Sequence, residues 1–586
     1  MLAINSAGVT NLQYFCALKK RLFNRLYKPY NISKMTDNKS LMENMRLTYR
    51  PKLPVTLRCP VRAIEGEPTE SVADQEAIKS LFPTTYGMPQ LTFERDDSAM
   101  PPEKPFNVGV ILSGGQAPGG HNVICGLYDG IKALNKYCRL YGFLGGPNGL
   151  VKHRYIEITG DMIDQYRNTG GFDLIGSGRT KLEKPEQFEA GLQILRELKI
   201  TALVIIGGDD SNTNAAILAE YYKAHDSGVQ VIGVPKTIDG DLKNEHIEIS
   251  FGFDTATKVY SELIGNVARD CNSAKKYWHF MKLMGRSASH IALECALQTR
   301  PNYCIISEEV EAKEKTLHDI AEEIANIVVK RHDMGMDYGT VLVPEGIVEF
   351  VPTMKKLISE LNEMLTKFPE ISNLREMEQN NFVREHLSEE NRVVYDSLPE
   401  EVARQLALDR DEHGNVMVSQ IESERLLSSM VAHVLDMRAE AGEIERIKFK
   451  TQHHFFGYEG RASFPSNFDA DYCYSLGYNA SHLIFVGATG YMSAITHLGR
   501  KAQDWVACGV PITMMMNMER RSGKDKPVIR KAMVDLEGAP FKHFVENRDK
   551  WALETCYIYP GPIQFFGPEE LVDKTSYTLF FEQFGK

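Results

Sequence analysis

The chain lacks the features that mark membrane-spanning, zinc-binding and nucleic-acid-binding proteins. None of its apolar runs approaches the roughly 20 residues needed to cross a bilayer. Its ten cysteines, from Cys16 to Cys556, include no CxxC pair and no His/Cys cluster at zinc spacing, which argues against structural zinc and a disulfide framework. The formal net charge of -11 provides no basic excess for a nucleic-acid backbone. These absences favour a soluble protein of a reducing compartment, with neither membrane nor nucleic acid as a partner.

What the chain does contain is typical of a large globular protein. Of its 586 residues, 43% are apolar and 25% are charged, which is an ordinary soluble composition. A chain of this length is too long for one hydrophobic core, so two or more α/β domains are expected.

The first 36 residues differ from the rest because they carry basic but no acidic side chains before Asp37. Apolar residues recur among them at helical spacing, as in an organelle presequence. The basic residues are Lys19, Lys20, Arg21, Arg25, Lys28 and Lys34. The alternatives are a disordered basic tail, or an upstream extension of a reading frame that starts at Met35. We therefore expect a cytoplasmic protein, or a mitochondrial or related organellar one if residues 1–36 act as a presequence.

The order of predicted elements indicates an α/β fold. Residues 37–105 are Pro-rich and are expected to form an irregular, extended arm, so the folded core should begin near Phe106. A strand at 107–112, a glycine-rich turn and a helix at 123–137 open the first βα unit. Further strand signals lie at 140–144, 202–206, 231–234, 277–283, 303–306, 340–343, 483–487 and 510–515. Helical stretches between most of them predict mainly parallel sheets that are covered on both faces.

One long stretch, 354–445, breaks the alternation of strands and helices. It is rich in Glu, Arg, Leu and Met and has helical periodicity with few β-branched residues. We predict a helical insertion, and we interpret its charge runs as solvated helix faces.

Two predicted strands, 201–206 (TALVII) and 229–234 (VQVIGV), are each followed by a polar turn, with a helix-like segment at 212–224 between them. In a parallel sheet, ligands bind at the carboxyl ends of the strands. The two polar turns should therefore meet in one crevice.

These turns carry carboxylates and a lysine suited to phosphoryl transfer. Asp209 and Asp210 are adjacent and would repel each other without a cation, such as Mg²⁺ carried by substrate phosphates. Asp239 or Asp241 could accept a proton from a hydroxyl that attacks phosphorus, while Lys236 neutralises the transferred group. The alternative for the first pair is structural, with one acid capping the following helix and the other solvated.

The turn at 113–120 (SGGQAPGG) follows a strand and precedes a helix, so its backbone N–H groups could approach a phosphate. It could equally be a packing turn. No Gly-Lys-Ser/Thr ends it and it lacks GxGxxG spacing, which disfavours P-loop nucleotide hydrolases and dinucleotide-binding dehydrogenases.

Three further motifs could bind a phosphosugar, since arginines suit its phosphate and a carboxylate its hydroxyls. They are Met284-Gly285-Arg286, Pro344-Glu345-Gly346 and Gly457-Tyr458-Glu459-Gly460-Arg461. Each is weak alone, because an arginine after glycine is more often a surface residue and Glu345 could be an ordinary loop acid.

Taken together, eight motifs in this order and spacing closely resemble the pyrophosphate-dependent phosphofructokinases of the long type. They are SGGQAPG (113–119), GSGR (176–179), GGDDS (207–211), PKTIDGDLKN (235–244), GFDTA (252–256), MGRSASH (284–290), PEG (344–346) and GYEGR (457–461). The resemblance runs from about Phe106 to near the C-terminus. It implies the phosphofructokinase fold, in which two mainly parallel-sheet α/β domains face a cleft, here with a helical insertion.

The resemblance also implies boundaries and a reaction. Residues 106–270 would form the donor-phosphate and Mg²⁺ domain, and 271–586 mainly the fructose 6-phosphate domain, with C-terminal segments that can return to the first. The implied enzyme is a glycolytic phosphotransferase that reversibly moves a phosphoryl group from pyrophosphate to the 1-hydroxyl of fructose 6-phosphate. The products are fructose 1,6-bisphosphate and phosphate.

Motif matching assigns roles by position. Asp239 would be the general base, Asp209 would organise Mg²⁺, and Asp210 and Lys236 would set the choice of donor. Gly114, Gly115 and Arg179 would lie near the pyrophosphate. The implied fructose 6-phosphate contacts are Thr237, Ile238, Asp239, Met284, Gly285, Arg286, Glu345, Tyr458, Glu459, Gly460 and Arg461. Lys276 and Tyr277 match positions that reach into a neighbouring subunit's site, which implies a homodimer or homotetramer.

Two rival interpretations stay open. The first is an ATP-dependent phosphofructokinase, and Asp210 separates the two because ATP-using relatives typically have glycine there. A carboxylate at that position takes up space and places negative charge near the nucleotide's α-phosphate. The second is a noncatalytic regulatory subunit that binds sugar phosphate, against which the retention of Asp209, Asp239, Arg286 and Arg461 argues.

Overall fold

The computed structural model divides the chain into two compact units, Met1–Tyr49 and Arg50–Lys586. The residues it describes are 40–368, 371, 375–398, 400–408, 416, 421–521, 524–565 and 572–585. The basic segment 1–36 and the alternative start at Met35 lie outside them. In the first unit, α2 (Leu41–Arg46) is capped by the Ser40 side chain, which accepts a hydrogen bond from the Glu43 N–H at 3.1 Å.

The second unit contains a ten-stranded sheet. Its five central strands run parallel to one another. In spatial order the strands are β1 (Val61–Pro68), β2 (Pro89–Arg95), β14 (Val506–Pro511), β13 (Tyr491–Thr496), β7 (Gln230–Thr237), β6 (Ile200–Gly207), β3 (Asn107–Leu112), β4 (Arg139–Phe143) and β5 (Tyr155–Ile158). A short strand, β8 (Phe251–Gly252), pairs with β7. The centre of this sheet is assembled from β3, β6, β7 and β13, so a strand from the C-terminal third completes the N-terminal core.

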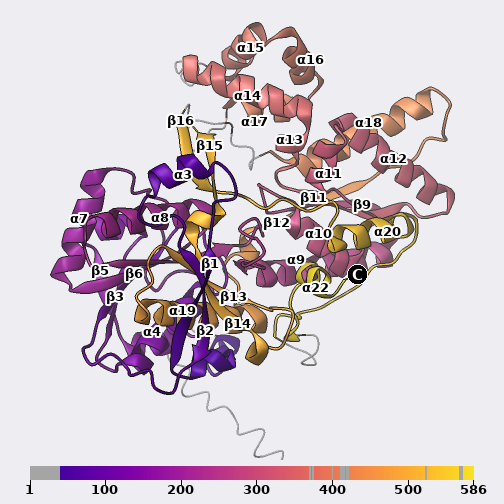
Figure 1. Ribbon diagram of the computed structural model, residues 1–586. Helices are drawn as coiled ribbons and strands as arrows, with labels where there is room; N and C mark the ends of the chain where they lie inside the picture. The colour runs from indigo at the N-terminus through magenta and orange to yellow at the C-terminus, as the bar shows by residue number, and fades with distance from the viewer. Residues whose placement is uncertain are drawn as a thin grey trace, which may run out of the picture. The chain divides into compact units, whose positions relative to one another are not determined.

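Both faces of this sheet are buried, as the apolar runs predict. Val108 and Val110 of β3 point into one hydrophobic cluster, whereas Ile111 belongs to the cluster on the other face. The first face is covered by α4 (Gly120–Leu134) and α19 (Asn467–Phe485), and the second by α7 (Pro185–Glu197) and α8 (Asp209–Ala224) (Figure 1). A Cβ at Gly126 of α4 would overlap the Tyr474 carbonyl of α19, so the glycine permits close helix packing.

The second unit also contains a separate sheet of four parallel strands. In spatial order it consists of β10 (Tyr303–Cys304), β11 (Tyr338–Pro344), β9 (Tyr277–Leu283) and β12 (Thr451–Phe456). Its surrounding helices are α9 (Phe253–Ala274), α10 (His290–Thr299), α11 (Ser307–Ala312), α12 (Leu317–Asp333), α18 (Ser423–Glu440), α20 (Ala539–Leu553) and α22 (Tyr577–Phe584) (Figure 1). Trp278, Phe280 and Val341 anchor its core, which shares one hydrophobic cluster with α12 and α18.

The described part of the predicted insertion is mainly helical, although Val416 and residues 441–445 are not. The short α13 (Ile347–Phe350) precedes it, and its helices are α14 (Pro352–Lys367), α15 (Glu376–His386), α16 (Glu389–Ser397) and α17 (Glu400–Leu408), followed by α18. Helices α14 to α17 gather as one group at the top of Figure 1. Leu357, Leu361 and Leu406 are fully buried, so the group has an apolar interior that continues the core of the four-stranded sheet.

Three sequence-based predictions are wrong. Residues 483–487 are not a strand: Leu483 and Ile484 lie on the buried face of α19, because a short apolar run cannot distinguish a buried helix turn from a strand. The strand predicted at 510–515 ends at Pro511 and continues as a 3₁₀ helix, η7 (Ile512–Met515). The supposedly irregular arm contains η2 (Val55–Arg58), β1, α3 (Gln75–Leu81) and β2, and the pairing of β2 with β14 joins it to the main sheet.

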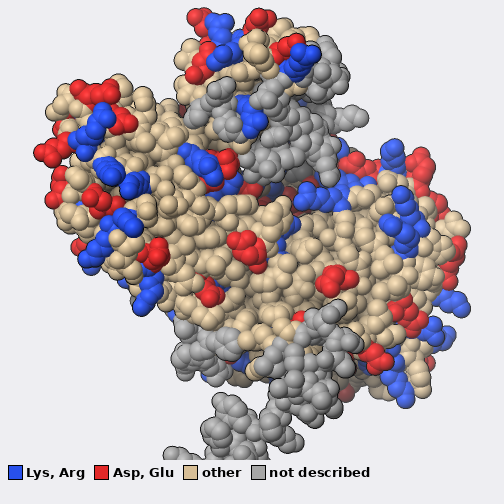
Figure 2. Space-filling view, turned by 180° about the vertical axis from the view of Figure 1, so that it is seen from behind, with Lys and Arg blue, Asp and Glu red and all other residues tan. Residues whose placement is uncertain are grey.

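The remaining elements are short. They are α5 (Pro147–Val151), α6 (Gly160–Tyr166), η5 (Tyr458–Gly460), η6 (Ala502–Asp504) and the hairpin β15 (Met516–Arg521) and β16 (Lys524–Ile529). Within the described ranges, no helix is both long and apolar enough to cross a membrane. On the face seen in Figure 2, acidic and basic side chains are interspersed among other residues.

Candidate active site

Three turns meet at one edge of the ten-stranded sheet because their strands are adjacent and parallel. The order β7-β6-β3 places the carboxyl ends of these strands side by side. They lead into the TIDGD turn, the GDDS turn and the glycine-rich turn respectively. This is the edge at which open α/β sheets bind ligands, as the sequence predicts.

Hydrogen bonds hold the glycine-rich turn against its neighbours. The Ser211 hydroxyl lies 2.8 Å from the Ser113 hydroxyl, and the Gly114 N–H donates to the Gly178 carbonyl at 3.0 Å. The second bond brings the loop that carries Arg179 beside this turn. Gly114 has a φ of 84°, and a Cβ there would lie 3.6 Å from the Lys236 ammonium.

The turn after β6 leads directly into α8, so that Asp209 and Asp210 form the first turn of the helix. Carboxylates there are stabilised by the positive end of the helix dipole, which is the structural role considered from the sequence. The Asp210 Oδ1 lies 3.1 Å from the Lys181 Nζ, and the Asp210 side chain is 48% exposed. The Asn212 amide donates to the carbonyls of Gly207 and Val234, at 2.6 and 3.3 Å, and thereby ties the ends of β6 and β7 together.

The turn after β7 presents Asp239 without a helix. The Asp239 N–H donates to the Thr237 hydroxyl at 3.1 Å, and this hydroxyl donates to Asp241 Oδ1 at 3.2 Å. Gly240 adopts a φ of 77°, and a Cβ there would press against Phe253 and His290 at 3.0 Å. These contacts fix the backbone of the turn from which the Asp239 side chain projects.

Burial perturbs both titratable groups that end β7. Burial, together with the negative charges of Asp241 and Glu345, raises the pKa of Asp239 to about 7 against the opposing effects of Lys531 and Lys236. Burial, together with the Arg461 guanidinium, lowers the pKa of Lys236 to about 8 against the opposing effects of the nearby aspartates. A carboxyl group with a pKa near neutrality can both take up and release a proton under physiological conditions.

The four-stranded sheet supplies a matching set of strand ends. In the order β11-β9-β12, the three strands end at Glu345, at Met284–Arg286 and at the turn 457–461. The Gly285 N–H donates to Glu345 Oε2 at 3.0 Å, and burial raises the pKa of Glu345. Three motifs that are distant in the sequence are therefore neighbours at one edge.

Tyr260 of α9 supports the last of these turns. Its hydroxyl donates to the Gly457 carbonyl at 2.6 Å, and a Cβ at Gly460 would overlap its ring. Tyr458 is exposed and Arg461 is half-buried, and the Arg461 Cζ lies 5.6 Å from the centre of the Tyr458 ring. The Glu459 side chain is also exposed.

Arg461 connects the two edges. Its Nε donates to the Gln116 carbonyl in the glycine-rich turn at 3.2 Å. A Cβ at Gly115 would overlap the Arg461 guanidinium, so Gly115 is needed for this approach. The sequence predicts that Gly115 lies near a phosphate. In the structure, the lack of a side chain at Gly115 also leaves room for the Arg461 guanidinium.

Lys531, which no motif indicates, is the second connection. Its Nζ lies 3.8 Å from Asp209 Oδ2 and 3.7 Å from Asp241 Oδ2, and it donates to the Ser287 hydroxyl at 2.7 Å. Lys181 and Tyr260 were also missed. The only sequence signal for Lys531 is its place in a short basic run near the C-terminus, and such runs are common on surfaces.

Some predicted site residues are not brought together with the rest. Lys276 and Tyr277 lie at the amino end of β9, which is about 20 Å from its carboxyl end at 3.3 Å per residue. The side chains of Ile238 and Met284 are buried in a hydrophobic cluster and not presented at the sheet edge.

Among the described residues, no group of three or more His, Cys, Asp or Glu side chains is arranged to hold a metal ion. Asp209 and Asp241 already flank the ammonium of Lys531, so their carboxylates form a corner that accommodates positive charge.

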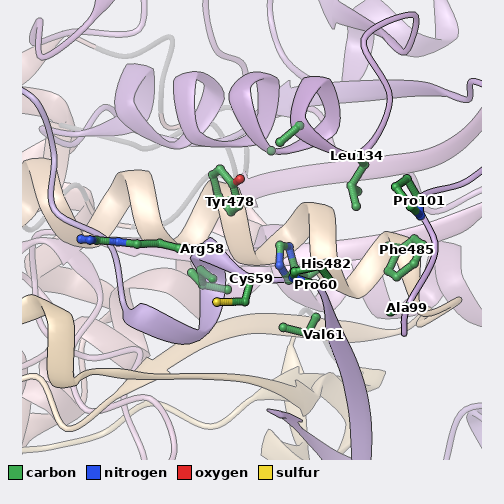
Figure 3. Close-up of a pocket in the computed structure, with 13 residues that line it drawn as sticks. Arg58, Cys59, Pro60, Val61, Ala99, Pro101, Leu134, Tyr478, His482 and Phe485 are labelled. Atoms are coloured by element: carbon green, nitrogen blue, oxygen red, sulfur yellow. The ribbon is translucent and has the colours of Figure 1, made fainter. Parts of the chain in front are cut away.

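A separate hollow of about 180 Å³ lies away from these turns (Figure 3). Side chains from residues 57–61, from Ala99 and Pro101, and from α4 and α19 line it. Its lining is apolar except for Arg58, Cys59, Tyr478 and His482. None of the predicted site residues borders this hollow. It is a gap in the packing between the N-terminal segment and the helix pair.

Comparison with known proteins defines the class. The model of the family described as phosphofructokinase matches residues 107–484, which is more than half of the chain. The chain belongs to the phosphofructokinase family. A solved pyrophosphate-dependent phosphofructokinase from Marinobacter aquaeolei shares this fold, with a TM-score of 0.50 and 16% identity over 77% of this chain and 93% of that one.

Curated relatives give a narrower comparison. The chain is 61% identical over 550 residues to a protein from Porphyromonas gingivalis named pyrophosphate–fructose 6-phosphate 1-phosphotransferase, covering 93% of this chain and 99% of the relative. A protein of the same name from Entamoeba histolytica is 51% identical over 548 residues, again covering 93% and 99%. The similarity therefore includes both sheets and the segments between them.

Proposed function

We propose that this chain is a pyrophosphate-dependent fructose 6-phosphate 1-phosphotransferase. It would move a phosphoryl group reversibly from pyrophosphate to the 1-hydroxyl of fructose 6-phosphate, giving fructose 1,6-bisphosphate and phosphate. The names and full-length similarity of the curated relatives support this reaction. The observation that carries it is the meeting of two strand-end edges through Arg461 and Lys531, with carboxylates on one edge and arginines on the other.

In the proposed reaction, Asp239 acts as the general base. The oxygen of the sugar 1-hydroxyl forms a bond to phosphorus while its proton passes to the Asp239 carboxylate. The bridging P–O bond of pyrophosphate breaks, and inorganic phosphate leaves with the bonding electrons. The pKa of about 7 suits Asp239 to receive this proton and to return it in the reverse direction.

The donor side would be formed by the edge of the ten-stranded sheet. The backbone N–H groups of Gly114 and Gly115 and the Arg179 guanidinium would bind the pyrophosphate, and Lys236 would neutralise the transferred group. Asp209 would hold Mg²⁺ together with the substrate phosphates. When bound, the divalent cation would offset the negative charge of pyrophosphate beside these carboxylates.

The acceptor side would be formed by the edge of the four-stranded sheet together with part of the TIDGD turn. Arg286 and Arg461 suit the 6-phosphate, and Glu345 suits a sugar hydroxyl. The other proposed contacts are Thr237, Ile238, Met284, Gly285, Tyr458, Glu459 and Gly460. For Ile238 and Met284 the contact would be through the backbone, since their side chains are buried.

Lys276 and Tyr277 have a different place in the proposal. Their distance from Arg286 along β9 suits residues that complete a neighbouring subunit's site and not their own. We therefore propose a homodimer or homotetramer. The domain division at about residue 270 and the assignment of the two sheets to donor and acceptor belong to the same proposal.

Donor choice would depend on Asp210, at the start of α8. Its carboxylate occupies space beside the phosphate loop, and the ion pair with Lys181 holds it in place. The ion pair also offsets part of the Asp210 charge. Exclusion of ATP would therefore depend more on the volume of the Asp210 side chain than on its electrostatic repulsion of the nucleotide. We also propose a cytoplasmic location, which suits described cysteines that are all free thiols.

The test is an initial-rate measurement on the purified single chain with fructose 6-phosphate and Mg²⁺. Pyrophosphate and ATP are compared as donors. We expect strong preference for pyrophosphate without any other subunit. Activity with ATP alone would be consistent with the fold but would contradict the proposed phosphoryl donor. No activity with either donor would favour a regulatory subunit.

A further inference from the structure

The segment 530–534 crosses from one sheet edge to the other, and its backbone is anchored on both sides. On the ten-stranded side, the Arg530 N–H donates to the Met515 carbonyl at 2.9 Å and the Ala532 N–H to the Asp241 carbonyl at 2.7 Å. The segment thus follows the β15–β16 hairpin and pairs directly with the TIDGD turn.

On the four-stranded side, two further bonds fix the same segment. The His290 Nε2 lies 3.0 Å from the Ala532 carbonyl oxygen, to which it donates. The Val534 N–H donates to Glu308 Oε1 at 3.0 Å, and this buried carboxylate also accepts the Ser289 N–H at 3.1 Å. Lys531 therefore projects from a backbone whose position is determined independently of its own side chain.

The hydrogen-bond donors of the Lys531 ammonium are only partly satisfied by the described residues. Among the described residues its hydrogen bond is to Ser287, at 2.7 Å. The carboxylates of Asp209 and Asp241, at 3.8 and 3.7 Å, are beyond the 2.7–2.9 Å of a charge-assisted hydrogen bond. An ammonium has three N–H donors. Two of them remain for an anionic oxygen that enters the site.

The surroundings of Lys531 favour an anion that arrives with its own cation. The lysine is 32% exposed, and the two carboxylates that flank it are 26% and 9% exposed, so a ligand can reach this corner. A bare anion would be repelled by Asp209 and Asp241, whereas a phosphate accompanied by a divalent cation would satisfy the carboxylates and the ammonium together.

We propose that Lys531 is a phosphoryl-binding residue of this active site, which donates to an oxygen of the transferred group from a segment anchored to both sheet edges. This deepens the proposed function and rests on it. Because the backbone on either side of Lys531 is bonded to both the acid-bearing and the arginine-bearing edge, the ammonium stands where the donor and acceptor must meet.

The test compares Lys531→Met, which keeps most of the volume, with Lys531→Arg, which keeps the charge. Lys526→Met is the matched control, because Lys526 lies in β16, directly before the segment that carries Lys531, and its Nζ is 3.0 Å from Glu183 Oε1 at an exposed position. We expect kcat/KM for pyrophosphate to fall about 100-fold in Lys531→Met, as for loss of one transition-state donor. Lys531→Arg should recover at least part of that loss, and Lys526→Met should stay close to the wild-type value.

Binding measurements separate this role from a structural one. Titration of magnesium imidodiphosphate should show weaker affinity in Lys531→Met, while fructose 6-phosphate affinity and Tm stay unchanged. Equal losses of sugar-phosphate affinity and Tm, or a kcat/KM within threefold of wild type, would overturn the proposal. If the wild-type chain used no pyrophosphate, the proposed function would fail, and the imidodiphosphate titration would still decide on Lys531.

Discussion

The turns after β6 and β7 occupy equivalent places in the sheet but differ in their chemistry. Each follows a parallel strand at the centre of the ten-stranded sheet, and each presents aspartates at its carboxyl end. Asp209 and Asp210 begin a helix and are accessible, and Asp210 pairs with Lys181. Asp239 begins no helix and is held by Thr237, and burial raises its pKa to about 7. The two turns therefore differ in that only the turn after β7 places a buried carboxyl group at the sheet edge, where burial raises its pKa.

The same comparison separates the two lysines near these turns. Lys236 is buried at the end of β7, where burial lowers its pKa to about 8. Lys181 is 40% exposed and pairs with a single carboxylate. An accessible ion pair contributes little to stability, so the Lys181–Asp210 pair is better suited to restricting space than to holding the fold together.

The largest expected effect is at Asp239. Asp239→Asn should lower kcat by about 10³-fold, because a general base acts in the transition state. Fructose 6-phosphate affinity, measured by titration without donor, should change little. Asp210→Asn is the matched control in the neighbouring turn and should keep most of the turnover with pyrophosphate. Parallel losses of kcat and sugar-phosphate affinity in Asp239→Asn would instead indicate a structural role.

A smaller effect is expected at Asp210. Asp210→Gly should raise kcat/KM for ATP by about 10- to 100-fold, which is less than unscreened repulsion of a few kcal/mol would give, because Lys181 already offsets the charge. Initial rates with both donors check this. Lys181→Met should lower kcat/KM for ATP or leave it unchanged. If Lys181→Met raised kcat/KM for ATP as much as Asp210→Gly does, the ion pair and not the volume of Asp210 would exclude the nucleotide.

The pH dependence should show the two shifted groups of β7. Asp239 must be ionised to accept a proton, so activity should fall about tenfold per pH unit below about 7. Lys236 must be protonated to bind the phosphoryl group, so activity should also fall above about 8. The profile of kcat/KM for fructose 6-phosphate reports the free enzyme and is the measurement to make. Lys236→Met should remove the alkaline limb and shift the acid limb to higher pH, because the Lys236 charge lowers the pKa of Asp239.

The smallest effect on activity is expected where the two turns are tied together. Asn212→Ala would leave the buried carbonyls of Gly207 and Val234 without the Asn212 donor, at a cost of about 1–3 kcal/mol. We expect a lower Tm with kcat within about threefold of wild type. Gln193→Ala on the exposed face of α7 is the control and should leave Tm unchanged. An unchanged Tm in Asn212→Ala would show that the strand pairing alone holds the turns in register.

Much of the site was predictable because parallel strands bring their carboxyl ends together. The strands 107–112, 202–206 and 231–234 are present, and the turns that follow them are neighbours as expected. The helix after the GDDS turn is also present, although it begins at Asp209 instead of at 212. One error has a clear physical cause: at 483–487 an apolar run is equally compatible with helix and strand, and only burial against the sheet distinguishes them.

By itself, the sequence determined the order of strands and turns, the residue types at the strand ends and the helical insertion. These are local properties, set by hydrophobic periodicity and by turn chemistry. Only the tertiary structure decided that β13 completes the first sheet, that Arg461 reaches Gln116 and that Lys531 stands between Asp209, Asp241 and Ser287. It also decided the pKa of Asp239, because burial and the charges of distant segments act through space and not along the chain.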